Sequence, residues 1–288
     1  MLNPPLSLLS NDLLSQIVEH IAIDLPFEMK SLKNLSIVDR AFTGFCQAYI
    51  FKELQLGTVK SGTKNRISKQ LAKIGKILDK EPSFANRVRK VHLMISHKAN
   101  TWLFKDPTFI NIVHLLGKSP IPPHTLDLSG LVDPFMFQDP ILIVGQLMQT
   151  FFSQTLTVLR LTDCKNVPST IFLVCPRLRD VLLNDVEVTE QSYDKYPDEQ
   201  CSDRELPALE RLDYRNSEGL VQQMITPPPR FKTGVVLWSK LRVLELSPCY
   251  KTTACLQPIL DGASNNLEEL YLINPGISDG AYSAYHQN

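Results

Sequence analysis

Short repeats of apolar and polar residues recur along the chain from residue 51 onward. LTVLRLTDC at 156–164 and LRVLELSPC at 241–249 both fit L-x-x-L-x-L-x-x-C, and LEELYL at 267–272 fits the first six positions. Such alternation over a short segment is typical of a β-strand. Weaker copies occur before and between these, and the third apolar position of each copy falls at Leu56, Leu93, Leu128, Leu161, Leu183, Tyr214, Leu246 and Leu272. Repeats of this kind predict a solenoid with one strand in each repeat.

The spacing between copies predicts a helix after most strands. Successive copies lie 22 to 37 residues apart, which leaves room for a helix and its loops. Asp-Pro pairs at 106–107 and 139–140 are favoured helix starts, because Asp caps the helix and proline lacks an N–H that would have no partner. Further helices are predicted at 64–80, at 168–175, at 218–225 and, around Pro258, at 253–263.

The first fifty residues have a different pattern, which predicts three short helices. Leu9, Leu13, Ile17 and Ile21 recur every four residues and form one apolar row, with Ser10 or Asn11 available as a cap. A second helix is predicted around Leu32, Leu35 and Val38, and a third around Phe42, Phe45 and Tyr49. Helices this short bury little surface alone, so they should pack against a neighbour or a partner.

Composition and charge indicate a globular protein of the cell interior. The chain has 288 residues, 43% hydrophobic and 21% charged, with 30 basic and 30 acidic side chains. Because the formal net charge is zero, we expect no general attraction to nucleic acid or to anionic membranes. The six cysteines are widely spread and include no CxxC pair, so a disulfide scaffold is not expected. The uncharged run 140–159 contains many polar residues and is interpreted as a helix followed by a strand, not as a membrane span.

Sequence signatures of catalysis are missing. The chain has no G-x-G-x-x-G, no P-loop and no G-x-S-x-G, and none of its six histidines lie at H-x-x-x-H spacing. We therefore expect no enzyme activity, no cofactor and no metal. Cys164 and Cys249 follow their strands directly and are interpreted as structural residues that face the repeat interior.

Candidate binding residues lie between the leucines of the repeats, where side chains point to the concave side of the predicted solenoid. We expect a protein partner to contact Arg160, Arg211, Asp213, Arg215 and Tyr271. Replacing Arg211 and Arg215 with alanine is expected to leave folding nearly intact, because exposed charges contribute little to stability. A solvated surface without a partner is the alternative. The insertions 187–207 and 226–234 are candidate recognition loops, and the basic residues of 60–80 are interpreted as the solvated side of a helix.

The N-terminal segment resembles an F-box. The family opens with a pattern like L-P-x-E-L-L-x-x-I, and this chain has LSNDLLSQI at 9–17. The later pattern L-x-x-L-S-x-V-x-[KR]-x-F is matched by LKNLSIVDRAF at 32–42, and the exit F-x-x-L-x-L by FKELQL at 51–56. The departures are Ser10 in place of the signature proline and Asp12 in place of glutamate. With repeats behind it, the whole chain is similar to fungal-type F-box/leucine-rich-repeat proteins.

This resemblance implies a fold and a function. The fold would be α/β: a small all-α F-box-like module at 1–50, then an irregular leucine-rich-repeat solenoid at 51–288 with parallel strands on its concave face and helices on its convex face. The chain would be the substrate-recognition subunit of a Skp–cullin–F-box ubiquitin ligase in the cytoplasm or nucleus. Its partners would be a Skp-type adaptor, a cullin held through it, and an unknown protein substrate, without nucleic acid or membrane. The resemblance assigns adaptor binding to Leu9, Ser10, Asp12, Leu13, Ile17, Val38 and Phe42.

Two alternatives to the ligase reading remain open: a leucine-rich-repeat interaction scaffold whose first helices only cap the solenoid, and a hydrolase with an unrecognised site. Leu9, Leu13 and Ile17 distinguish the first two readings. Exposure of these side chains favours docking of an adaptor, and burial favours the capping role.

Overall fold

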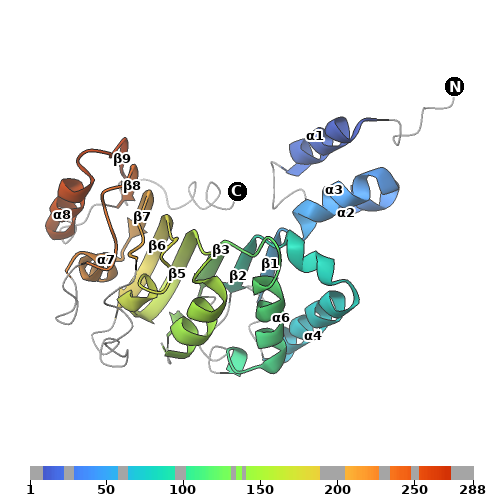
Figure 1. The fold of residues 1–288 in the computed structure, drawn as a ribbon, viewed down its shortest axis with the longest axis horizontal. Coiled ribbons are helices and arrows are strands. Elements are labelled where there is room, and N and C mark those ends of the chain that lie inside the picture. The colour runs from blue at the N-terminus through green and yellow to red at the C-terminus, as the bar shows by residue number, and fades with distance from the viewer. Residues whose placement is uncertain are drawn as a thin grey trace. The chain divides into compact units, whose positions relative to one another are not determined.

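The structure is a computed structural model of the chain, and it divides into two compact units (Figure 1). The first contains the described residues up to Leu54, and the second those from Gln55 onward. The structure describes residues 9–22, 29–57, 64–94, 102–130, 134–137, 141–188, 205–226, 234–247 and 253–273.

The first unit consists of three helices, as the sequence predicts: α1 (Asn11–Ala22), α2 (Met29–Val38) and α3 (Arg40–Ile50). Ser10 Oγ accepts a hydrogen bond from the N–H of Leu13 at 3.3 Å, which caps α1. Asp39 caps α3 in the same way through Ala41, at 2.8 Å. The unit has a hydrophobic core of its own, which comprises Leu14, Val18, Ala22, Leu32, Phe42 and Cys46.

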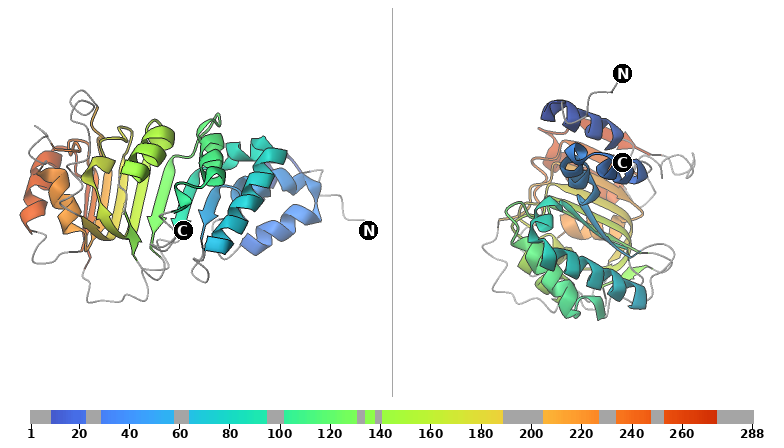
Figure 2. Two further views of the ribbon diagram at one scale, coloured as in Figure 1. Left: turned by 90° about the horizontal axis from the view of Figure 1, so that it is seen from below. Right: turned by 90° about the vertical axis from the view of Figure 1, so that its right-hand side faces the viewer.

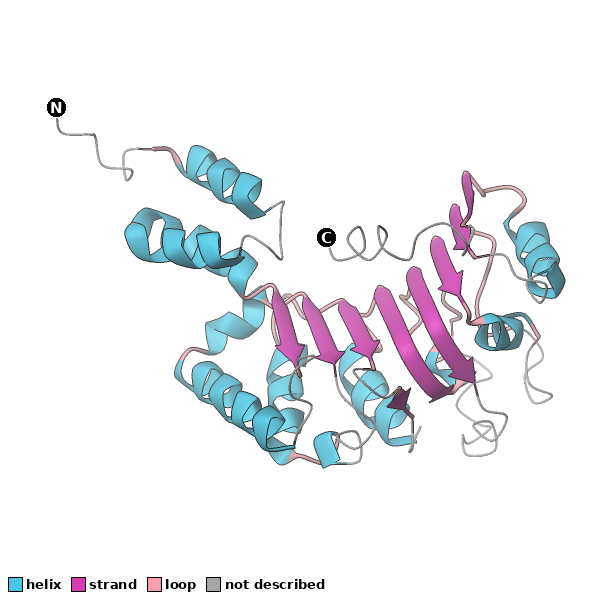
Figure 3. Cartoon of the chain, turned by 180° about the vertical axis from the view of Figure 1, so that it is seen from behind, coloured by secondary structure: helices cyan, strands magenta, loops and turns pink. Residues whose placement is uncertain are grey.

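The second unit is built on a sheet that has nine strands in the described residues, and its strand pairs from β2 to β9 are all parallel (Figure 3). Its strands follow chain order, except that the short β4 pairs with β5 to the side of the main path. Figure 2 shows the strands lying side by side in this order. The strands are β1 (Glu53–Leu56), β2 (Lys90–Met94), β3 (Thr125–Ser129), β4 (Phe135–Met136), β5 (Val158–Val167), β6 (Asp180–Val188), β7 (Arg211–Arg215), β8 (Val243–Leu246) and β9 (Glu269–Leu272).

The register predicted from the repeats is confirmed from β2 to β9. Leu93 pairs with Leu128, Leu128 with Leu161, Leu161 with Leu183, Leu183 with Tyr214, Tyr214 with Leu246, and Leu246 with Leu272. All of these side chains are fully buried except Leu272. Leu272 is 59% exposed and its neighbour Leu270 45%, because among the described residues no further strand packs beyond β9.

Helices cover one face of this sheet (Figure 1). They are α4 (Lys64–Lys80), η2 (Pro82–Arg87), α6 (Pro107–Gly117), η3 (Ile141–Phe152), η4 (Ser169–Ile171), α7 (Glu218–Ile225) and α8 (Thr253–Ala263). The predicted cap of α6 is confirmed: an Asp106 carboxylate oxygen accepts hydrogen bonds from the N–H groups of Thr108 and Phe109, at 2.9 and 3.2 Å. The cap predicted at 139–140 lies outside the described residues. No helix in the described ranges is long and apolar enough to cross a membrane.

Two predicted helices differ in detail. The predicted helix at 168–175 is only the short 3₁₀ helix η4, because Pro168 and Pro176 bracket the segment and leave room for little more than one turn. The helix of 141–152 is a π-helix and not an α-helix. The insertion loops proposed as recognition elements fall almost wholly outside the described residues, at 189–204 and 227–233.

Candidate interaction surfaces

The sheet has a second face, which we call the polar face: the side of β2 to β9 to which the residues between the core leucines point. The alternation is clear in β2 and in the first half of β5 and β6, where core positions are buried and the others partly exposed. Because the strands are in register, residues of this face form rows across the sheet. The central row is His92, Asp127, Arg160, Leu182, Asp213, Glu245 and Tyr271.

Four charged side chains on β7 and β8 form an ion-paired group, the β7–β8 cluster: Arg211, Asp213, Arg215 and Glu245. Glu245 Oε2 lies 3.1 Å from Arg211 Nη2, and Glu245 Oε1 lies 3.0 Å from Arg215 Nη2. Arg215 Nε also lies 3.8 Å from Asp213 Oδ1. Both carboxylates are buried, with side-chain exposures of 3% for Asp213 and 10% for Glu245. The two arginines therefore neutralise acids of their own sheet.

This arrangement changes the expectation that Arg211 and Arg215 can be replaced with alanine without loss of folding stability. The change of both to alanine would leave Glu245 and Asp213 buried without their cations. Breaking a buried ion pair from one side is strongly destabilising, because the remaining charge stays desolvated. We now expect the double change to destabilise the fold, so it is unsuitable as a simple test of binding.

Asp213 is held in an unusual electrostatic environment. Desolvation is the main cause that raises the pKa of its carboxyl group to about 6, and the neighbouring carboxylate of Glu245 raises it further. Arg215, Arg211 and Arg160 act in the opposite direction. Its burial means that Asp213, predicted as a contact residue, offers a partner little surface.

A second group of interacting polar side chains lies on β2 and β3 and is called the β2–β3 cluster: Lys90, His92 and Asp127. Lys90 Nζ lies 3.1 Å from Asp127 Oδ2, and His92 Nε2 lies 3.7 Å from Asp127 Oδ1. His92 Nε2 also lies 3.1 Å from the hydroxyl of Ser129. The carboxylate of Asp127 is thus engaged by two side chains of the preceding strand, β2.

Between the two clusters lies the middle segment of the polar face, formed by Val158 and Arg160 on β5 and Asp180 and Leu182 on β6. Val158 pairs in register with Asp180, and Arg160 with Leu182. All four side chains are partly exposed. Within the described part of the chain, neither the Arg160 guanidinium nor the Asp180 carboxylate has a hydrogen bond or ion pair. Burial raises the pKa of Asp180, Glu210 adds to the rise, and Arg211, Arg160 and Arg179 oppose it.

The structure thus distributes the predicted binding residues unevenly. Arg160 is available, whereas Arg211, Asp213 and Arg215 are paired within the β7–β8 cluster. Tyr271 is 49% exposed at the end of the central row, and its hydroxyl donates to Glu269 Oε2 at 2.7 Å. Sequence reasoning did not select Asp180, Leu182 or Glu245 as site residues. The cross-strand register alone could have indicated Glu245, because it places that residue beside Asp213 and diagonal to both arginines.

A different surface lies on the helical unit. Leu13 and Ile17 of α1 are 48% and 39% exposed, and Ile37 and Val38 at the end of α2 are 80% and 74% exposed. The buried positions of α1 are instead Leu14, Val18 and Ala22. The predicted helix is therefore confirmed, but its buried side lies one residue along from the predicted row.

The other residues assigned to adaptor binding divide into surface and core. Ser10 and Asp12 are exposed, and Leu9 is partly buried against the core of the unit. Phe42 is 2% exposed at the centre of that core, so its placement on a docking surface is corrected: it is a core residue. Ile37 near the end of α2 and Phe42 near the start of α3 thus have opposite roles, and Asp39, which caps α3, separates the two helices.

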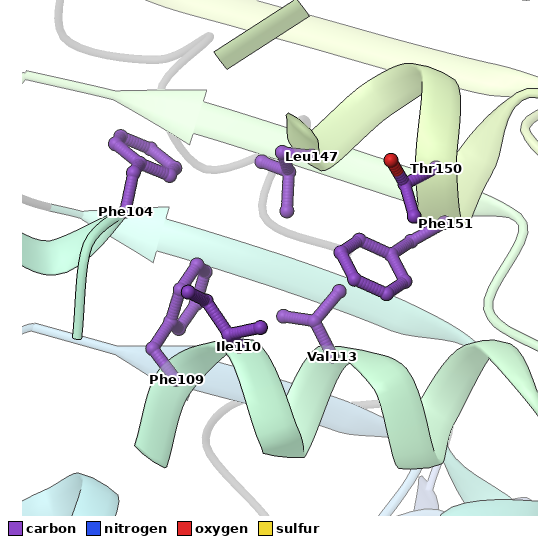
Figure 4. A pocket seen from close by; sticks show the side chains of 7 residues that line it. All are labelled: Phe104, Phe109, Ile110, Val113, Leu147, Thr150 and Phe151. Atoms are coloured by element: carbon purple, nitrogen blue, oxygen red, sulfur yellow. The ribbon is translucent and has the colours of Figure 1, made fainter. Parts of the chain in front are cut away.

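The helix-covered side of the sheet contains an apolar cavity of about 220 Å³ between α6 and η3 (Figure 4). Its lining side chains are Phe104, Phe109, Ile110, Val113, Leu147, Thr150 and Phe151. The Thr150 hydroxyl donates to the Gly145 carbonyl at 3.2 Å and so has an internal partner. The lining holds no acid, base or nucleophile suited to catalysis.

The described cysteines have the structural role expected for Cys164. Cys46, Cys164, Cys175 and Cys255 are free thiols and buried. The Cys164 thiol lies 3.5 Å from the carbonyl oxygens of Leu128 in β3 and Thr162 in β5, so it contacts strand backbone where loop backbone was expected. Burial raises the pKa of the Cys164 thiol, and it raises that of Cys175 to about 12, so neither is a ready nucleophile. Cys249 lies outside the described residues.

Neither metal ligation nor likeness to known proteins adds a further assignment. In the described ranges, no three His, Cys, Asp or Glu side chains gather as they would around a metal ion. No protein-family model matches the chain, and no curated protein is significantly similar to it.

Proposed function

We propose that the chain is a non-catalytic substrate-recognition subunit of a Skp–cullin–F-box ubiquitin ligase, working in the cytoplasm or nucleus. In this proposal, the helical unit is an F-box-like module that binds a Skp-type adaptor and, through it, a cullin. The parallel sheet with its helices is a leucine-rich-repeat solenoid, and its polar face binds a protein substrate. The protein contributes positioning to the reaction, and the ligase partners supply the chemistry.

The observation that carries this proposal is the exposure of Leu13 and Ile17 on a helix that already buries a different row. On α1, Leu14 and Val18 supply the side chains that pack in the core of the unit. The exposed residues Leu13 and Ile17 are therefore not needed for that core. Exposed apolar side chains in one row are typical of protein interaction sites. Exposure was also the criterion that separates docking from capping.

Ser10, which stands where the family pattern has proline, can take over one role of that proline. The signature proline would start the first helix, and here the Ser10 hydroxyl caps that helix at the same place. The start of α1 is therefore secured without proline. Any contact that the proline ring would make with the adaptor is replaced by a smaller polar group.

The test is binding of the full chain to a purified Skp-type adaptor. We expect a complex at micromolar concentrations, and we expect Ile17→Glu to weaken it by about 10- to 100-fold, because a buried isoleucine contributes roughly 1.5–3 kcal/mol. Gln16→Glu adds the same charge at the adjacent exposed position and is the matched control. It should bind within about twofold of the wild type, as a surface change outside the apolar row.

Two outcomes would count against the proposal. One is a wild-type chain that does not bind the adaptor, which would favour the interaction scaffold. The other is equal loss of binding in Ile17→Glu and Gln16→Glu, which would show that the Leu13–Ile17 row is not the contact. Circular dichroism of each variant confirms that the helices remain folded.

A further inference from the structure

The polar face has one stretch whose charged side chains make no hydrogen bond or ion pair among the described residues. On one side of it, Asp127 is held by Lys90 and His92. On the other side, Glu245 is held by Arg211 and Arg215. The middle segment between them, on β5 and β6, retains a guanidinium and a carboxylate without partners among the described residues. The acids of the β2–β3 and β7–β8 clusters are thus already paired, whereas the charged side chains of the middle segment remain available to a ligand.

The middle segment combines two kinds of contact on neighbouring strands. Arg160 stands opposite Leu182, and Val158 stands opposite Asp180, so each charged side chain is next to an aliphatic one. Arg160 and Asp180 occupy diagonal positions of the β5–β6 pair, within reach of one extended ligand. Arginine is enriched in protein-binding hot spots, and its planar guanidinium can donate two hydrogen bonds to one carboxylate.

The charges of this segment restrict the class of ligand. Arg160 and Asp180 carry opposite formal charges, so the segment has no excess of either sign. A phosphate backbone needs several cations and gains nothing from a carboxylate. A simple carboxylate ligand would use Arg160 but leave Asp180 unpaired. A polypeptide with an acidic and a basic side chain around an apolar one satisfies all four residues.

We propose that the middle segment binds an extended polypeptide segment through an Asp or Glu side chain on Arg160, a Lys or Arg side chain on Asp180, and an apolar side chain against Val158 and Leu182. This proposal rests on the substrate-binding role proposed above for the polar face, and it is independent of adaptor binding. It names Arg160 as the anchor, in place of the paired Arg211 and Arg215.

The probe is a displayed library of random 12-residue peptides, panned against the full wild-type chain. We expect enriched peptides to carry an acidic and a basic residue at a recurrent spacing, with an apolar residue near them. Panning against Arg160→Glu should replace the preferred acidic residue with a basic one, because the anchoring charge is inverted. A selected synthetic peptide should bind Arg160→Gln at least about 10-fold more weakly than the wild type, as expected for loss of a charge-assisted bidentate contact.

Arg177→Glu is the matched control, since Arg177 is exposed in a turn outside the polar face and undergoes the same change of charge. It should select the same peptides as the wild type. Thermal melting checks that Arg160→Glu and Arg160→Gln remain folded, which we expect because Arg160 makes no hydrogen bond or ion pair in the described part of the chain.

The failures of the two proposals can be told apart. Absence of any enriched peptide on the folded wild type, or a preference that Arg160→Glu leaves unchanged, overturns the peptide site without touching adaptor binding. Loss of adaptor binding in Ile17→Glu with peptide selection intact supports both proposals. If the chain selects the expected peptides but does not bind the adaptor, the peptide site is supported and the proposed ligase role is overturned.

Discussion

Asp213 combines deep burial with a carboxyl group that faces one other acid and three arginines. Its folded-state pKa of about 6 lies above the ordinary value of 3.8. The folded protein therefore holds this proton to higher pH than the unfolded chain does. It follows that ionisation of Asp213 lowers stability as the pH rises from about 4 to about 6, and that this loss remains at neutral pH.

Replacing Asp213 with Asn tests whether ionisation of Asp213 lowers the stability of the fold as the pH rises. Relative to the wild type, Asp213→Asn should gain about 2 kcal/mol of unfolding free energy between about pH 4.5 and pH 7.5, because only the wild type must ionise a buried carboxyl group. Urea unfolding of both proteins at the two pH values measures the gain. If the two proteins differ in unfolding free energy by the same amount at both pH values, the buried position of Asp213 beside another acid would be contradicted.

Residue identity alone could identify charged candidates but not their pairing. The repeat pattern placed Arg160, Arg211 and Arg215 on one face, and the structure agrees. Which of them is free depends on the diagonal contacts with Glu245, and these depend on side-chain rotamers that no spacing rule fixes. The choice of Arg160 as an anchor therefore required coordinates.

At the scale of single elements, each strand is stabilised by the leucines of its neighbours. Leu161→Ala or Leu246→Ala should lower the unfolding free energy by about 2–5 kcal/mol, because each removes a fully buried side chain and leaves a cavity. Leu272→Ala is the matched control. It occupies the same row but is 59% exposed, so its effect should stay within about 0.5 kcal/mol.

Chemical denaturation of the three leucine variants measures these effects. An equal loss at Leu161 and Leu272 would mean that β9 is packed as tightly as the central strands. No loss at Leu161 would contradict the register itself.

The elements show where sequence periodicity is informative. It predicted the strand register and the limits of α4, α6, α7 and α8, because leucine spacing, Asp caps and prolines act locally. It predicted an ordinary helix at 141–152, where the structure has a π-helix. Apolar residues fill most of that segment, so no polar face distinguishes one helical period from another. In α1, two adjacent apolar rows compete, and packing in the core shared with α2 and α3 decides that Leu14 and Val18 are buried.

At the scale of the whole molecule, the two units have separate hydrophobic cores. The helical core is assembled from α1, α2 and α3 alone. A core of that size gives marginal stability, whereas the sheet unit buries leucines on strand after strand. We therefore expect the helical unit to unfold at a lower temperature than the sheet unit.

Differential scanning calorimetry of the full chain tests this separation. Phe42→Ala should shift only the first transition and Leu161→Ala only the second, because each residue belongs to one core. A single transition that both changes shift equally would show that the cores unfold together.

The unequal lengths of the strands have one more consequence. Strands β5 and β6 span 10 and 9 residues, whereas β3 and β7 span 5. In a sheet held together by neighbouring strands, fluctuations begin at the two ends and stop where the paired backbone is longest. Amide hydrogens of β5 and β6 should then be the last to exchange with solvent. Since these strands carry Arg160 and Asp180, the proposed peptide site would persist while the flanks of the sheet open and close.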